Sequence, residues 1–210
     1  MRRYNCHGST RLELFVVTFA LAILTFIMVL ALCEGRPRDG RRIACVSNLK
    51  QIGLGFRMWA NDHAEKLPWE VSNNDGGTLQ DADSVDVWRH FQIASNELKT
   101  PKILACPADV SRQRATGWDT LRNTNISYFV LMNTEPAKPA RVLAGDRFVS
   151  TNNKVVSGVL VASDARKLRW VRGGHEKAGN VVFIDGSVNQ MSTDDWRAAF
   201  SNQAVRLAIP

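Results

Sequence analysis

The chain has 210 residues, of which 45% are hydrophobic and 22% are charged, and its formal net charge is +7. This composition excludes a disordered tail and a collagen-like rod, and the length suits about one globular domain with an appendage. The positive charge could attract DNA, anionic polysaccharide or lipid headgroups. However, no lysine and arginine run interleaved with aromatic residues marks a nucleic-acid face. We therefore expect ordinary solvated charge and no nucleic-acid partner.

An uncharged apolar run occupies residues 14–33. A helix of about 20 residues covers about 30 Å, the thickness of the hydrocarbon core of a bilayer. The run is longer than the apolar core of a secretory signal peptide, and no A-x-A-like cleavage site follows it. Leu32 is not the small residue that a lipoprotein signal would place before its acylated cysteine. We therefore expect a retained transmembrane helix.

Basic residues on the two sides of this run bear on its orientation. Arg2, Arg3 and Arg11 precede it, and the positive-inside rule places them in the cytoplasm. Arginines between positions 36 and 42 oppose this orientation, but a short basic leader has little alternative to staying inside. We expect a single span with a cytoplasmic N-terminus and an extracytoplasmic C-terminal domain.

Glu13 lies one residue before the apolar run. An ionisable group costs roughly 2.5 to 3.5 kcal/mol at the centre of a bilayer and less near its edge, so such groups usually have a partner. Glu13 either stays at the interface beside Arg11 or pairs with a group inside the membrane. The residues leave both interpretations open.

Residues 8–13 read GSTRLE, and ahead of the apolar run they resemble the cleavage and methylation segment of type IV prepilins and type II secretion pseudopilins. The resemblance implies that a prepilin peptidase cuts after Gly8 and that the new N-terminal residue, Ser9, is methylated. It also implies that Glu13 pairs with the N-terminal amine of a neighbouring pilin-like subunit. In a low dielectric such a pair offsets part of the desolvation of both charges. Ser9 replaces the usual Phe or Met, and Arg11 stands where the family is apolar.

After the apolar run, Gly35, Pro37 and Gly40 predict a bend or break in the helix. Apolar residues then recur every three or four positions until about Asn61, which predicts an amphipathic helix with its apolar face against a sheet. The predicted face consists of Ile43, Val46, Leu49, Ile52, Phe56 and Trp59.

Three further motifs follow in order: CVSNLKQIGL from Cys45, Cys-Pro-x-Asp from Cys106 to Asp109, and His175 followed after nine residues by Asp185-Gly186. Together they are similar to a bacterial pseudopilin-like family that joins a prepilin leader to an outer domain named for its His, nine residues and Asp-Gly. The resemblance covers residues 8–188. It implies a leader at 1–8, a transmembrane helix at 9–33, a helix extension at 34–61 and an extracytoplasmic α+β domain at 62–210.

The cysteines favour an oxidising compartment for the outer domain. Cys6 lies in the leader and Cys33 at the membrane edge, which leaves Cys45 and Cys106 as a pair that can form a disulfide. Closing a loop of about 60 residues would stabilise the fold by roughly 4 kcal/mol in the chain-entropy model. A metal site is the alternative, but the close-spaced ligand pairs of structural zinc are missing. We expect a disulfide, no metal and no cofactor.

The remaining elements follow from local pattern. We expect a loop at 72–83, a helix at 84–98 with Val85, Trp88, Phe91 and Leu98 on one side, and mostly loop at 132–154. We expect strands at 103–106, 126–131, 155–163, 180–184 and 187–191. Asp185-Gly186 predicts a two-residue hairpin turn with positive φ at both positions, and Ser192 or Thr193 caps a short final helix. The predicted fold is α+β and pilin-like, with the long N-terminal helix packed on an antiparallel sheet.

His175 is the residue most open to a functional role, because histidine can act as a base, a metal ligand or a pH switch. It follows Gly173-Gly174 and could approach Asp164 or Asp185 across adjacent strands. We favour a structural role in which its ring pins the loop to the sheet. No Ser-His-Asp order, phosphate-binding glycine motif or HExxH is identifiable, so we do not expect an enzyme.

The resemblance implies a pseudopilin-like structural or accessory subunit of a type II secretion or type IV pilus-like system. Its expected location is the bacterial inner membrane with the outer domain in the periplasm. The expected partners are the prepilin peptidase, other pilin-like subunits and the lipid bilayer. Two alternatives remain open: an anchored periplasmic binding or enzymatic domain that uses His175 and nearby aspartates, and a DNA-uptake pilin.

Overall fold

The computed structural model describes residues 10–33, 37–132, 142–151, 154, 157–171, 173–175, 178–200 and 204–210. The chain divides into two compact units, Met1–Gly40 and Arg41–Pro210. The fold is α+β, with an N-terminal apolar helix and an antiparallel sheet. Gly8 and Ser9, the predicted processing residues, lie outside the described residues, as do residues 34–36 of the predicted bend.

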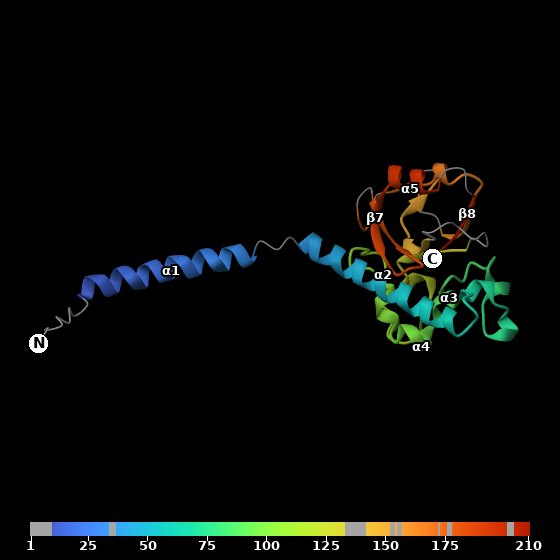
Figure 1. Ribbon diagram of the computed structural model, residues 1–210, viewed down its shortest axis with the longest axis horizontal. Helices are drawn as coiled ribbons and strands as arrows, with labels where there is room; N and C mark the ends of the chain where they lie inside the picture. Colours follow the sequence, from blue (N-terminus) through green and yellow to red (C-terminus); the bar gives the residue numbers. More distant parts are fainter. Residues whose placement is uncertain are drawn as a thin grey trace, which may run out of the picture. The chain divides into compact units, whose positions relative to one another are not determined.

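The first unit contains helix α1 (Arg11–Cys33), drawn in blue in Figure 1. Its segment Arg11–Leu30 is long and apolar enough, by length and composition, to cross a membrane. The first turn is closed by a reciprocal cap. The Thr10 backbone N–H donates to Glu13 Oε2 (3.0 Å), and the Glu13 backbone N–H donates to Thr10 Oγ1 (3.4 Å). This capping box satisfies backbone donors that the first turn would otherwise leave free.

Helix α2 (Pro37–Asn61) ends at the residue where the amphipathic pattern predicted it to end. Most of its predicted apolar face lies in the core, but Ile43 is 68% exposed, and the prediction for this residue was wrong. Cys45 is buried instead, because it lies four residues before Leu49 on the same face of the helix, where it also forms a disulfide. Successive helical residues are separated by about 100°, so Ile43, two residues earlier, lies on the opposite side.

A six-stranded antiparallel sheet forms the centre of the second unit, in the order β4-β8-β1-β2-β6-β7. Its strands are β1 (Tyr128–Leu131), β2 (Val142–Asp146), β4 (Gly158–Ala162), β6 (Ala178–Phe183), β7 (Val188–Ser192) and β8 (Val205–Ile209). A separate two-stranded sheet pairs β3 (Val149–Ser150) with β5 (Arg169–Trp170). The prediction of mostly loop at 132–154 missed β2 and β3, and β8 was not predicted.

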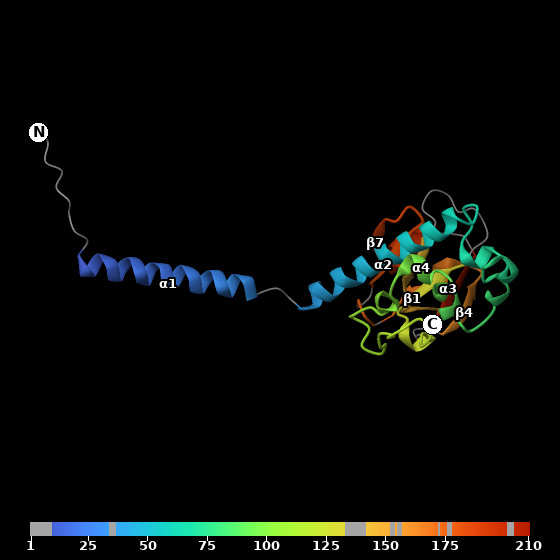
Figure 2. The ribbon, with the colours of Figure 1, turned by 90° about the horizontal axis from the view of Figure 1, so that it is seen from below.

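Alternate residues of the sheet enter two different cores. Tyr128 and Val130 join the core under α2, whereas Phe129 and Leu131 join a second core that includes Trp196 of helix α5 (Thr193–Ala199). Figure 1 shows α2 and α5 on opposite faces of the sheet, and Figure 2 shows α2 on the face seen from below. The second unit therefore has three layers, as expected when successive side chains of a strand point to opposite faces.

The segment between α2 and the sheet consists of short elements. The helix predicted at 84–98 is two helices, α3 (Trp88–Gln92) and α4 (Ser95–Leu98), and Val85 is 67% exposed. The strand predicted at 103–106 was wrong. Pro101 begins a 3-10 helix, η4 (Pro101–Leu104), because its fixed φ suits a first helical turn. The other 3-10 helices are η1 (Pro68–Glu70), η2 (Asn73–Asp75), η3 (Leu79–Asp81), η5 (Asn123–Asn125) and η6 (Ala165–Lys167).

Residues 184–187 lie between β6 and β7, and the hydrogen bond between Phe183 and Ser187 leaves three of them in the loop, so the predicted two-residue turn was wrong. The Gly186 N–H donates to the Phe183 carbonyl (2.9 Å), and the Phe183 N–H donates to the Ser187 carbonyl (2.9 Å). Of the two predicted positions only Gly186 has a positive φ, +85°. This combination is typical of a turn that ends in a left-handed glycine. At the end of β7, Ser192 caps α5 by accepting from the Asp195 N–H, as predicted.

Candidate functional site

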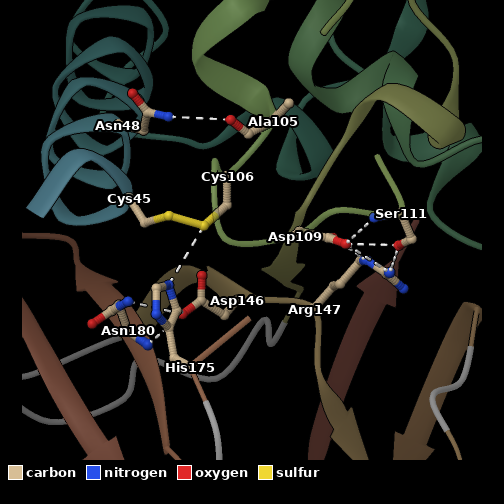
Figure 3. Close-up of a disulfide and its surroundings, with 10 residues drawn as sticks. All are labelled: Cys45, Asn48, Ala105, Cys106, Asp109, Ser111, Asp146, Arg147, His175 and Asn180. Atoms are coloured by element: carbon tan, nitrogen blue, oxygen red, sulfur yellow. Dashed lines mark hydrogen bonds and ion pairs between the residues drawn. A yellow bond between two sulfur atoms is a disulfide. The ribbon is translucent and has the colours of Figure 1, made fainter. Parts of the chain in front are cut away.

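Three sequence motifs far apart in the chain meet in one buried cluster on the α2 side of the sheet (Figure 3). Cys45 of α2 and Cys106, just after η4, form a disulfide with a Cα–Cα distance of 5.1 Å. His175 lies in the turn before β6, and its Nε2 is 3.5 Å from Cys106 Sγ. The cysteines and the histidine are all buried. The expected disulfide is thus present, and His175 is its neighbour.

The acidic neighbour of His175 is Asp146, at the end of β2, which sequence reasoning missed. Asp146 Oδ2 lies 3.7 Å from His175 Nε2 and accepts hydrogen bonds from the backbone N–H (2.7 Å) and Nδ2 (3.0 Å) of Asn180. The predicted partners lie elsewhere. Asp164 caps η6 and pairs with Arg166, and Asp185 belongs to the hairpin loop. Neither Asp164 nor Asp185 contributes to the cluster.

Burial decides the charge state of this pair. Burial, together with the smaller effect of the positive charge of Arg42, lowers the pKa of His175 to about 4. Burial raises the pKa of Asp146 to about 7, although the hydrogen bonds from Asn180 oppose the shift. Between these values the imidazole is neutral and the carboxyl group is protonated. The cluster thus avoids much of the cost of burying isolated charges.

A second polar group beside the disulfide explains the aspartate of Cys-Pro-x-Asp. Arg147 donates to Asp109 from Nε to Oδ2 (2.7 Å) and from Nη2 to Oδ1 (3.2 Å). The Ser111 hydroxyl also donates to Asp109 Oδ1 (2.7 Å). Burial raises the pKa of Asp109, but hydrogen bonds from Arg147 and Ser111 and the charge of Arg147 bring it below the ordinary value. The pair anchors the chain after Cys106 to the residue that follows β2.

Arg147 also connects this pair to the loop that carries His175. Its guanidinium lies 4.6 Å from the centroid of the Phe148 ring, within cation–π range. Phe148 packs against Gly173 and Gly174, and a Cβ atom at Gly173 would overlap with the ring. The absence of a side chain at Gly173 therefore lets the loop approach Phe148 and bring His175 to the disulfide, and a Cβ atom at Gly174 would lie 3.2 Å from the ring.

The motif that runs from His175 through nine residues to Asp185-Gly186 corresponds to strand β6 with a turn at each end. His175 precedes the strand and faces the disulfide to α2. At the other end the Asp185 carbonyl accepts from Arg57 Nη1 of α2 (2.9 Å). Between them, Gly53 of α2 packs so closely on Val182 that an added Cβ would lie 2.5 Å from its Cγ2. The motif thus fixes both ends of β6 against α2.

The chemistry open to this cluster depends on the state of its sulfurs. Among the described residues, Cys45 Sγ, Cys106 Sγ and His175 Nε2 are the ligand atoms that gather within 4.8 Å of one another. A metal would need the sulfurs as thiolates, which the disulfide precludes. His175 is 7% exposed and Asp146 is 2% exposed, so neither presents a surface to a substrate. In the oxidised form the cluster joins α2, β2 and β6.

Comparison of the chain with protein-family models, with curated proteins and with solved structures finds no match. The residues and their geometry are therefore the basis for a functional proposal.

Proposed function

We propose that this chain is a membrane-anchored, pseudopilin-like structural or accessory subunit of a type II secretion or type IV pilus-like system. It would cross a bacterial inner membrane once, with its N-terminus in the cytoplasm and its outer domain in the periplasm. The observation that supports this proposal most is Glu13 in the first turn of an exposed apolar helix, five residues after Gly8. That spacing matches the prepilin cleavage segment.

The cap at the start of α1 is compatible with an assembly role for Glu13. One carboxylate oxygen accepts from Thr10, and an ionised carboxylate offers about four lone-pair sites. The same side chain can therefore close its own helix and still accept a bond from the amine of a neighbouring subunit. At the edge of the bilayer, the N-terminal ammonium group of the neighbouring subunit would offset part of the cost of desolvating the Glu13 carboxylate.

The outer domain has the features of a stable extracytoplasmic module. Its disulfide suits an oxidising compartment, and α2 buries an apolar face against an antiparallel sheet, an arrangement consistent with a pilin-like fold. The burial of His175 and Asp146 favours a structural role for the cluster over the rival binding or enzymatic domain. A catalytic pair would have to reach its substrate.

The assembly role can be separated from helix capping by two substitutions of Glu13. Glu13→Gln keeps an oxygen that accepts from the Thr10 N–H but removes the charge, whereas Glu13→Ala removes both. We expect both variants to insert into membranes and both to lose cross-linked assemblies with pilin-like subunits. Glu65→Gln, on the exposed surface of the outer domain, is the matched control and should assemble normally. Assembly of Glu13→Gln at the level of the unmodified chain would refute charge pairing.

A further inference from the structure

We propose that the reduced form of this domain binds one zinc-like divalent metal ion at the site now occupied by the disulfide. The ligands are the thiolates of Cys45 and Cys106, Nε2 of His175 and a carboxylate oxygen of Asp146. The proposal concerns the outer domain alone and does not depend on the assembly role of α1.

Two distances within the cluster suit a tetrahedral metal, and Cys45 Sγ, Cys106 Sγ and His175 Nε2 lie within 4.8 Å of one another. Asp146 is not part of that group of three, so its carboxyl oxygen must move closer to the sulfurs when a metal binds. With metal–sulfur bonds of about 2.3 Å and metal–nitrogen or metal–oxygen bonds of about 2.0–2.2 Å, neighbouring ligand atoms lie roughly 3.3–3.8 Å apart. His175 Nε2 lies 3.5 Å from Cys106 Sγ and 3.7 Å from Asp146 Oδ2. Two edges of the tetrahedron are therefore close to this spacing before any metal binds. Figure 3 shows the imidazole and the carboxyl group of Asp146 side by side, both facing the disulfide.

Reduction supplies the missing ligands. A dithiol reductant transfers two electrons and two protons to the Cys45–Cys106 bond, which breaks to give two thiols, while the reductant becomes a disulfide. Metal binding then releases both thiol protons to solvent, together with the proton of the Asp146 carboxyl group where that group is protonated. The sulfurs must separate to about 3.8 Å in a tetrahedral site, and rotation about χ1 allows this with the Cα atoms near their present distance of 5.1 Å.

The surroundings already orient the other two ligands. Two hydrogen bonds from Asn180 hold Asp146 Oδ2, and the packing of Gly173 and Gly174 against Phe148 holds the loop of His175. Such fixed outer contacts orient ligands and strengthen metal binding. The four ligands come from four separate segments of the chain, so they do not form the closely spaced cysteine pairs by which structural zinc sites are found in sequences. The proposed site therefore differs from the expectation, drawn from the sequence, that the chain binds no metal.

Disulfide and metal exclude each other, because one pair of sulfurs cannot be both bonded together and present as two thiolates. A bound metal would therefore protect the cysteines from oxidation and hold α2 on the sheet in the reduced domain. Zinc and the disulfide would be alternative connections at the same position.

The test uses the full chain in detergent with Cys6→Ser and Cys33→Ser, so that Cys45 and Cys106 are the only cysteines. The chain is reduced with a dithiol, freed of it under anaerobic conditions and titrated with Co²⁺. We expect one Co²⁺ per chain, with thiolate-to-cobalt charge-transfer bands and the visible absorption of a tetrahedral site, both abolished by Zn²⁺. The oxidised chain should show neither. Absence of the charge-transfer bands from the reduced chain would overturn the proposal.

Matched substitutions identify the nitrogen and oxygen ligands. His175→Gln should weaken Co²⁺ binding at least about tenfold, whereas His90→Gln, at a buried histidine outside the cluster, should leave it unchanged. Equal binding by the two variants would overturn the role of His175, and unchanged binding by Asp146→Asn would overturn that of Asp146. Circular dichroism of the oxidised variants verifies folding. A second measurement uses the reduced chain with all four ligand residues unchanged. Zn²⁺ should slow the alkylation of Cys45 and Cys106 in this chain, and an unchanged alkylation rate would contradict the proposed metal site.

Discussion

Replacing Arg147 by methionine would leave a buried carboxylate without its ionic partner. Arg147 and Asp109 are 7% and 3% exposed and share two hydrogen bonds. Removing one member of such a pair costs about 3 to 5 kcal/mol, because the remaining charge has no compensation in a low dielectric. The hydroxyl of Ser111 still donates to Asp109, so we expect the lower end of this range, about 3 kcal/mol.

The cost should depend on pH with a definite sign. In the unmodified chain the pKa of Asp109 is lower in the folded than in the unfolded state. Its stabilising contribution is therefore complete above the unfolded pKa of about 4 and is lost as the pH falls through the folded pKa. Without Arg147, burial dominates and raises the pKa of Asp109, so that protonation relieves the unpaired charge. The deficit of the variant should be largest at neutral pH and should shrink toward about pH 4.

Urea unfolding followed by tryptophan fluorescence measures the free energy of unfolding of Arg147→Met and of the unmodified chain. An unchanged m-value would show that the folded and unfolded states of the two proteins are comparable. Arg166→Met is the control, because the Arg166–Asp164 pair has side chains that are 55% and 24% exposed. Exposed pairs contribute about 1 kcal/mol or less. Equal losses in the two variants, or a loss at Arg147 that does not change with pH, would refute the reasoning.

Three further predictions concern the outer domain. Replacing Cys45 and Cys106 together by alanine should lower the free energy of unfolding by about 4 kcal/mol, measured in urea. Burial lowers the pKa of His90 to about 4, so the unfolded state takes up its proton first as the pH falls from about 6.5. The free energy of unfolding should therefore fall as the pH is lowered from about 6.5 to about 4. His90→Gln should make this fall smaller, as measured by urea titrations at a series of pH values. Gly53→Ala should lower the free energy of unfolding by about 1 to 3 kcal/mol, measured by thermal unfolding, because the added methyl group would overlap with Val182 of β6. Gly40→Ala is the control and should cost nothing, because a Cβ atom there meets no other atom within 4 Å.

Each of these has a contrary result. The double cysteine variant should be insensitive to a dithiol, and a further loss on reduction would place the stabilising bond elsewhere. An unaltered pH profile in His90→Gln would show that this histidine does not titrate differently on folding. Equal effects of alanine at Gly53 and Gly40 would contradict the close contact between α2 and β6.

Local pattern predicted the elements whose signal lies in neighbouring residues. The amphipathic repeat ending at Asn61 and the β-rich runs around Val130 and Val182 correspond to α2, β1 and β6. The disulfide was predictable because two cysteines remained outside the leader and the membrane edge. The Thr10 and Glu13 cap was also readable from its T-x-x-E spacing, although Thr10 was not among the expected partners of Glu13.

The missed features depend on contacts between distant segments. Strand β8 pairs with both β1 and β4, and its short apolar sequence near the end of the chain gives no local sign of this position. Asp146 becomes the neighbour of His175 because β2 and β6 pair in a register that no single strand specifies. Asp185 is closer to His175 in sequence but lies in the hairpin loop beyond the far end of β6. Ile43 follows the three-residue steps of the pattern, but these steps drift around the helix, so that Ile43 lies about 180° from Ile52 and is exposed.

The proposed function is tested most directly by the mature N-terminus of the chain. Intact-mass measurement and N-terminal sequencing of protein extracted from its own membranes would define that end. We predict a chain that starts at Ser9 with a methylated amine, which would place a free ammonium near Glu13 of a neighbouring subunit. A chain that still starts at Met1, in membranes that contain an active prepilin peptidase, would contradict the proposal.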